Sequence, residues 1–183
     1  EPQTVLFAGS PDLASKAGRT PRSTCRISLD GAIECNTAVY STRGLSTTPF
    51  RFDPPDGRKW VSVAAGSAHV CGLQSNGAAW CAGRNDNGQL GSDGPDSIDP
   101  RPIPAITEAL SICASYLATC VLDRQHRVTC FGAGYDGAAG RRFPGADWQG
   151  LDCGGVTTAC AVNAAGEMWC RSGSFPLKRV LAS

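Results

Sequence analysis

The chain has 183 residues, of which 42% are hydrophobic and 18% are charged, and its 17 basic and 16 acidic residues leave a net charge of +1. This composition excludes a disordered chain and is typical of one loop-rich globular domain, which we expect to span residues 1–183. Because the basic residues are scattered rather than clustered, nucleic acid is not an expected partner. No apolar stretch approaches the roughly 18 residues of a membrane span, so we expect no membrane insertion by this segment.

The ten cysteines indicate the compartment in which the chain folds. Their number is even and high, and cytosolic reductants would keep such a set of thiols reduced, whereas secreted domains use cysteines as disulfides. The sequence therefore predicts a secreted protein, or the ectodomain of a surface protein.

A repeated cysteine spacing divides the chain into four units. Nine residues separate the two cysteines of each pair, and successive first cysteines lie 46, 49 and 40 positions apart. The pairs are Cys25 and Cys35, Cys71 and Cys81, Cys120 and Cys130, and Cys160 and Cys170. A period near 45 residues is typical of a four-stranded propeller blade. We predict blades at roughly 1–50, 51–100, 101–145 and 146–183.

Each cysteine pair brackets a predicted β-hairpin. Turn residues stand at the midpoint in three units, as in Leu29-Asp30-Gly31 and Ser75-Asn76-Gly77, while Arg124-Gln125-His126 is the exception. Cysteines placed symmetrically about the turn face each other across the ladder, within reach of a disulfide. A metal site is not expected, because no C-x-x-C spacing supports it.

A short apolar strand is predicted before each hairpin. It covers 61–66 in the second unit, 110–115 in the third and 150–155 in the fourth, and Val5–Ser10 takes this part in the first. The last residues, Val180–Ser183, resemble the same strand beginning again. This ending is compatible with closure against the first unit or with an interrupted array.

Two cysteines lie outside the pairs. Cys113 and Cys153 both precede the first cysteine of their hairpin by seven residues. Equivalent positions in successive blades can meet, so one hypothesis is a disulfide between the two blades. The alternative is two buried thiols.

The loop after the second hairpin carries the most specific motif. It reads Gly83-Arg84-Asn85-Asp86-Asn87-Gly88-Gln89-Leu90-Gly91, and a degraded version follows the third hairpin at 132–140. Together with Val63–Leu73, Asn76-Gly77 and Trp80-Cys81, this loop resembles an RCC1-like repeat of the cysteine-bearing, extracellular kind.

That resemblance implies an all-β fold, an RCC1-like β-propeller or partial propeller of four disulfide-stapled blades. The family usually closes seven blades, so four blades form either a small closed propeller or an open arc. The resemblance also implies that His69 braces its blade by hydrogen bonding. Guanine-nucleotide exchange, the activity associated with the family, is disfavoured by the disulfide-permissive composition.

No constellation of catalytic residues is apparent, and we expect no enzyme activity and no cofactor. The only histidines are His69 and His126, the second at a hairpin tip where we expect it to be solvated, and no G-x-S-x-G motif occurs. Aspartates crowd the loop from 84 to 104, at positions Asp86, Asp93, Asp96 and Asp99. Calcium is an alternative there, but the spacing does not match an EF-hand and turns require the same residues, so no metal is predicted.

The predicted binding residues lie in two loops between blades. Arg84 and Asp86 belong to the loop 84–104, and Tyr135, Arg141 and Arg142 belong to the segment 132–148. Aromatic and arginine side chains are enriched at binding hot spots, and function on repeat scaffolds usually resides in loops. We therefore predict a non-catalytic module that binds an extracellular or cell-surface protein.

Two alternatives to protein binding remain open. One is lectin-like or matrix-adhesion binding of a glycan by exposed tryptophan, although we expect Trp60, Trp80, Trp148 and Trp169 to pack between blades. The other is structural assembly, in which exposed blade edges drive self-association.

Overall fold

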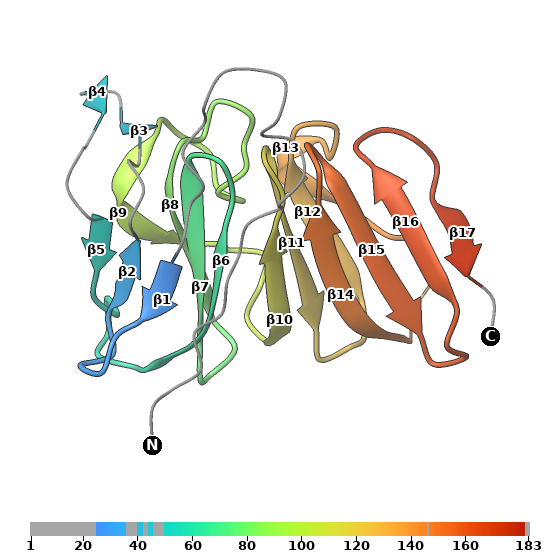
Figure 1. The fold of residues 1–183 in the computed structure, drawn as a ribbon, viewed down its shortest axis with the longest axis horizontal. Coiled ribbons are helices and arrows are strands. Elements are labelled where there is room, and N and C mark those ends of the chain that lie inside the picture. The colour runs from blue at the N-terminus through green and yellow to red at the C-terminus, as the bar shows by residue number, and fades with distance from the viewer. Residues whose placement is uncertain (1–24, 36–39, 42–43, 46–49, 146, 182–183) are drawn as a thin grey trace.

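The computed structural model describes residues 25–35, 40–41, 44–45, 50–145 and 147–181, and every regular element among them is a β-strand. Four antiparallel sheets follow one another along the chain (Figure 1). A small ribbon of β3 (Tyr40–Ser41) and β4 (Gly44–Leu45) lies beside them. No helix long and apolar enough to cross a membrane occurs in the described part of the chain.

Each sheet is one blade, and its strands pair in sequence order. The first contains β1 (Cys25–Ile27), β2 (Ile33–Cys35) and β5 (Phe50–Phe52). The second contains β6 (Trp60–Ala65), β7 (His69–Gln74), β8 (Ala79–Gly83) and β9 (Ser97–Pro102). The third contains β10 (Ala109–Ala114), β11 (Ala118–Asp123), β12 (Val128–Gly132) and β13 (Gly137–Arg142). The fourth contains β14 (Trp148–Gly154), β15 (Thr158–Asn163), β16 (Met168–Ser172) and β17 (Lys178–Leu181).

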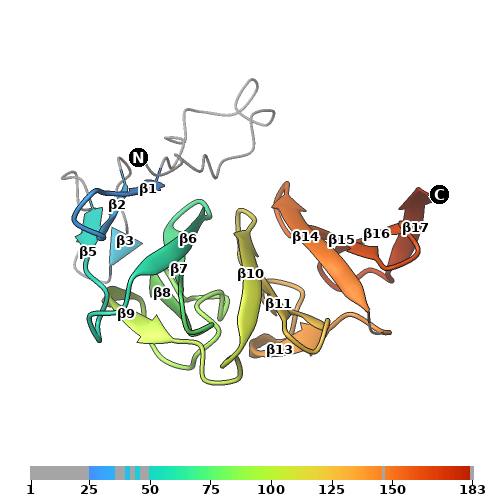
Figure 2. The same cartoon turned by 90° about the horizontal axis from the view of Figure 1, so that it is seen from below.

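The four sheets stand side by side in an open arc (Figure 2). The first and last sheets lie at opposite ends, so the described residues form a partial propeller rather than a closed ring. β17 pairs with β16 as the outer strand of the fourth sheet, which corrects the prediction that Val180 begins a further repeat. The predicted strand Val5–Ser10 lies outside the described residues.

The predicted hairpins and their disulfides are present in all four sheets. In each, the two cysteines are direct cross-strand partners with Cα atoms 4.0 Å apart. The strands predicted before the second, third and fourth hairpins correspond to β6, β10 and β14. Symmetric spacing about a turn was therefore enough to define the register.

Apolar side chains gather between successive sheets rather than in one central core. Because side chains alternate along a strand, the two faces of a hairpin enter different cores. Cys71 and Cys81 face the third sheet, whereas Val70 and Ala82 face the first. A third core joins the third and fourth sheets and contains Cys120, Cys130, Ala159 and Ala161. Each blade is thus stabilised by its neighbours, as in other repeat proteins.

Candidate functional site

Two rims bound the arc. The predicted segments 84–104 and 132–148 begin on one rim and continue as β9 and β13 toward the other. The loop rim consists of three inner turns, 66–68, 115–117 and 155–157, and three outer loops, 84–96, 133–136 and 173–177. The register places turns and loops at the same end, because His69 pairs with Gly83 and Ala118 with Gly132. The hairpin tips form the opposite rim. In Figure 1 the loop rim is uppermost.

The outer loop of the second blade is held by a buried asparagine. The Asn85 amide nitrogen donates to the carbonyl oxygens of Ser92 and Gly94, both at 2.8 Å, and its carbonyl oxygen accepts from the Leu90 N–H at 3.0 Å. Leu90 is fully buried in the core between the second and third blades. Asp96 accepts from the Asn85 N–H, so this aspartate serves the turn.

A polar hollow of about 330 Å³ lies where this loop meets the third blade. Its lining comes from both sides: Asn85, Asp86, Asn87, Gly88, Ser92, Asp93, Gly94, Gly137 and Ala138. Gly88 sits so close to the third blade that an added Cβ would lie 2.2 Å from the Ala138 nitrogen. The structure therefore brings Asp86 to the junction of two blades, where a ligand can contact both.

The predicted binding residues divide between separate places. Arg84 pairs with Asp86 on the loop rim. Arg141 pairs with Asp136 through two hydrogen bonds of 2.8 and 2.7 Å, and this contact lowers the pKa of Asp136. Arg142 is exposed, but it pairs with Thr129 toward the hairpin rim. The five residues are therefore not one cluster.

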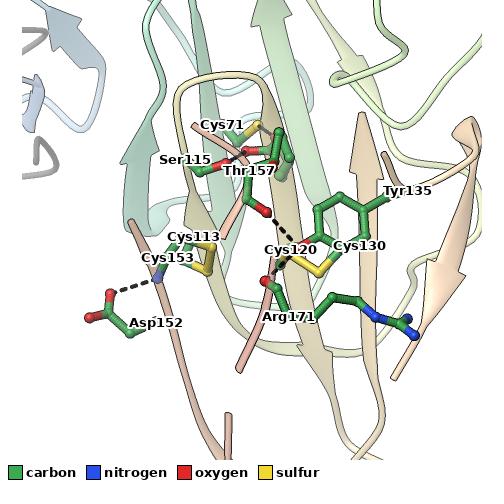
Figure 3. Close-up of a disulfide and its surroundings, with 12 residues drawn as sticks. Cys71, Cys113, Ser115, Cys120, Cys130, Tyr135, Asp152, Cys153, Thr157 and Arg171 are labelled. Atoms are coloured by element: carbon green, nitrogen blue, oxygen red, sulfur yellow. Dashed lines mark hydrogen bonds between the residues drawn. A yellow bond between two sulfur atoms is a disulfide. The ribbon is translucent and has the colours of Figure 1, made fainter. Parts of the chain in front are cut away.

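Tyr135 is not a surface residue, which corrects its prediction as a binding residue. Its side chain is 0% exposed, and its hydroxyl donates toward the carbonyl oxygens of Thr157 at 2.6 Å and Arg171 at 3.1 Å. Figure 3 shows the ring between the third and fourth blades, beside the Cys120–Cys130 disulfide. The tyrosine therefore joins blades, because a buried phenol needs a hydrogen-bond partner and finds one on the next sheet.

Cys113 and Cys153 form a disulfide between the third and fourth blades (Figure 3), with Cα atoms 5.5 Å apart. Their equal spacing from the hairpins hides a difference in register. Cys113 pairs directly with Cys120 and faces the fourth blade, whereas Cys153 pairs with Ala159 and faces the third. The pairing next to the turn spans five positions in the third blade, Ala114 to Thr119, but four in the fourth, Gly154 to Thr158. This one-residue shift of register places Cys153 on the opposite face of its sheet and makes the bond possible.

The two histidines are both hydrogen-bonded. His69 is 2% exposed and its Nε2 lies 2.9 Å from the Thr119 hydroxyl of the third blade, in agreement with the predicted bracing role. Burial lowers the pKa of His69 to about 4. Nδ1 of His126 lies 2.9 Å from the Trp148 carbonyl oxygen, so this histidine is half-buried between blades rather than simply solvated.

Three exposed apolar side chains on the loop rim are not among the binding residues predicted from the sequence. Tyr116 is 43% exposed, Val156 49% and Phe175 69%. Their turns are linked in a row, since the Tyr116 N–H donates to Gly155 and the Gly173 N–H donates to Thr157. The available signal was an apolar residue at the centre of an inner turn, in place of the small residues of the turn 66–68.

The tryptophans offer no exposed ring. Trp60 and Trp148 are 3% and 4% exposed. Trp80 and Trp169 are half-buried against inter-blade cores, and their indole nitrogens donate to Gln74 and Glu167. Packing between blades is therefore the observed role of all four.

Successive antiparallel blades of three or four described strands with a repeated hairpin define a β-propeller repeat protein. The model of the regulator of chromosome condensation (RCC1) repeat matches residues 60–89, which run from β6 through the Asn-Gly-Gln-Leu-Gly loop. The fold predicted from the sequence, an RCC1-like propeller with disulfides, is thus the observed one. No curated protein sequence matches the chain.

Solved structures give the same fold at low identity. Yeast RCC1 (Prp20), in a crystal structure with Kap60, has a TM-score of 0.66 and 17% identity over 81% of this chain and 39% of its own. Human WBSCR16 has a TM-score of 0.69 and 14% identity over 87% of this chain and 50% of its own. The ectodomain of the Arabidopsis thaliana receptor kinase ACR4 has a TM-score of 0.50 and 17% identity over 88% and 55%. The chain therefore spans about half or less of the length of these proteins.

Proposed function

We propose that this chain is a non-catalytic module of the extracellular space or the cell surface, and that its loop rim binds another protein. The observation that carries this proposal is the row of exposed Tyr116, Val156 and Phe175 on that rim. Large apolar side chains that remain exposed in a row, near ion-paired arginines, have the composition of a binding hot spot.

The cysteines support the proposed compartment. All ten form disulfides, and such a set persists only where reductants are scarce. Two solved structures with this fold are receptor-kinase ectodomains, from Arabidopsis thaliana and Physcomitrella patens. These likenesses support, at the level of fold, a place outside the cell.

The charged loops add specificity to this rim. The Arg84–Asp86 and Arg141–Asp136 pairs are solvent-accessible, and each can exchange its internal partner for a charge on a bound protein. The polar hollow beside Asp86 can accept a side chain from that protein. Rim charges of this kind govern association rate and selectivity more than affinity.

The test is binding of the oxidised, fluorescently labelled chain to intact cells. Replacing Tyr116, Val156 and Phe175 together by serine is expected to remove binding. Leu29→Ser is the matched control, because Leu29 is 93% exposed on the hairpin rim. Equal loss in both variants, or no loss in either, would reject the loop rim as the binding surface.

The same assay separates a protein partner from a glycan. Brief protease treatment of the cells is expected to abolish binding, while glycosidase treatment is expected to leave it. The opposite pattern would favour the lectin-like alternative, which the buried tryptophans do not support.

A further inference from the structure

The two ends of the arc present different faces to solvent. On the first blade, a charged row crosses the sheet, because Arg26 pairs with Glu34 and Glu34 pairs with Arg51. Arg51 also bonds Asp30 and Asp53, so the network is internally neutralised. A polar outer face of this kind is what a capping repeat needs.

Among the described residues, no such charged row lies on the outer face of the fourth blade. Its outer face carries Cys160, Val162, Met168 and Cys170, all half-buried and none of them part of an inter-blade core. The equivalent positions in the second blade are Cys71, Leu73, Ala79 and Cys81, which are 0 to 2% exposed beneath the third blade. The last sheet therefore presents the surface that the earlier sheets cover with the next blade.

A charge of opposite sign stands at each end of this face. The register aligns Asp152, Cys160, Cys170 and Lys178 in one row across the sheet. Asp152 and Lys178 are both exposed. In the second and third blades the first residue of the row is Ala64 or Cys113, so the acidic start is particular to the uncovered blade.

We propose that this face binds the same face of a second copy of the chain in a two-fold symmetric dimer. When the axis lies between the sheets and parallel to the strands, the row runs in opposite directions in the two copies. Asp152 of each copy then lies opposite Lys178 of the other, and the disulfides, Val162 and Met168 are covered between them. A two-fold interface of this type uses one patch twice.

Head-to-tail assembly is the competing arrangement, and the first blade opposes it. Packing the fourth blade against the first would bury the Arg26, Glu34 and Arg51 network against sulfur and apolar side chains. Buried charges lose solvation that such neighbours do not replace. The charged face of the first blade therefore limits assembly to two copies. If the outer faces of both end blades could pair, the copies would form a filament.

Sedimentation velocity of the oxidised chain over a range of concentrations tests the dimer. The wild type is expected to change reversibly from monomer to dimer. Met168→Glu places a charge at the centre of the interface and is expected to leave only monomer. Arg26→Ala, on the capped face, is the matched control and is expected to leave the dissociation constant within about twofold.

Charge exchange tests the symmetry itself. Asp152→Lys or Lys178→Asp alone creates two like-charge contacts per dimer and is expected to raise the dissociation constant about tenfold or more. The double variant D152K/K178D restores both pairs and is expected to return the constant to within about threefold of wild type. Far-ultraviolet circular dichroism and a count of free thiols establish that each variant is folded.

Three outcomes would overturn the proposal: wild-type monomer at every concentration, a dimer that tolerates M168E, or a dimer whose double charge variant is no better than the singles. The proposed contacts come from the strands β14 to β17 and not from the side chains of Tyr116, Val156 and Phe175, so the variant of these three residues is expected to dimerise normally. Failure of the dimer and failure of the binding rim are therefore separate results.

Discussion

The loops that leave β8 and β12 occupy equivalent places in neighbouring blades, yet they are anchored differently. In the second blade, Leu90 is fully buried, and Asn85 ties the loop to itself. The equivalent residues of the third blade are Ala139, which is exposed, and Gly134, which has no side chain. Tyr135, at the position of exposed Asp86, supplies the missing anchor by reaching the fourth blade.

This difference shows that one repeat position can be exposed to solvent in one blade and buried in the core in the next. The second loop is anchored by its own Leu90 and leaves Asp86 exposed on the rim, where it pairs with Arg84. The third loop has no such anchor and is held by Tyr135 against the fourth blade, and a disulfide reinforces the same junction. The junction between the third and fourth blades is therefore the one on which single changes should have the largest effect.

The largest expected effect is that of Tyr135→Ala. Removing a fully buried aromatic ring leaves a cavity and should lower the free energy of unfolding by about 4 kcal/mol. Asp86→Ala changes the equivalent, exposed position and should leave the urea midpoint unchanged. Tyr135→Phe, which removes only the hydroxyl, should cost about 1 kcal/mol. Similar stability of Y135A and D86A would show that the two loops are anchored alike.

The next effect is that of removing the bond between the third and fourth blades. Cys113 and Cys153 are 40 residues apart in sequence, so in the chain-entropy account the C113A/C153A variant should lose about 3 to 4 kcal/mol. Limited proteolysis of this variant should cut first in the fourth blade, since none of the other described sheets covers its outer face. Retention of wild-type protease resistance would mean that Tyr135 and the apolar core suffice to hold the junction.

The junction between the second and third blades is expected to respond to acid. His69 is buried as a neutral ring, and its pKa falls from 6.5 to about 4. The unfolded chain therefore binds a proton at higher pH than the native chain does. The contribution of neutral His69 to stability should be fully present above pH 6.5. The free energy of unfolding should fall by about 3 kcal/mol as the pH drops toward 4.

Urea titrations at several pH values measure this loss. His69→Gln should be less stable overall, because it disturbs the contact with Thr119, but its stability should be nearly flat across that window. His126→Gln is the control and should retain the wild-type slope. A wild-type stability that does not change between pH 6.5 and 4 would show that His69 is charged or solvated in the native state.

Sequence reasoning succeeded where the determinants are local. Cysteines placed symmetrically about a turn define hairpin register, because both partners lie within one short segment. The same is true of Trp80, which stands next to Cys81 and so enters the opposite core. Four repetitions of one local pattern were sufficient to predict a fold of disulfide-stapled blades.

Sequence reasoning failed where the determinants are distant. The carbonyl groups that accept from the Tyr135 hydroxyl lie 22 and 36 residues away in the sequence. No residue close to Tyr135 in the sequence indicates these partners. An aromatic residue in a glycine-rich loop is therefore predicted, wrongly in this case, to be exposed. The faces on which Cys113 and Cys153 lie depend on a one-residue difference in strand register, which their equal spacing from the hairpins does not reveal.

The smallest expected effect concerns the ion pairs that flank the two loops. Arg84→Ala and Arg141→Ala remove solvent-accessible pairs, which are screened and stabilise folded proteins little. Neither variant should shift the melting temperature measurably, in contrast to Tyr135→Ala beside them. If the loop rim binds a protein, each variant should instead slow association, and more strongly at low salt. A clear loss of thermal stability in either arginine variant would show that its ion pair stabilises the fold. Binding by the loop rim would then depend on the exposed Tyr116, Val156 and Phe175 without that pair.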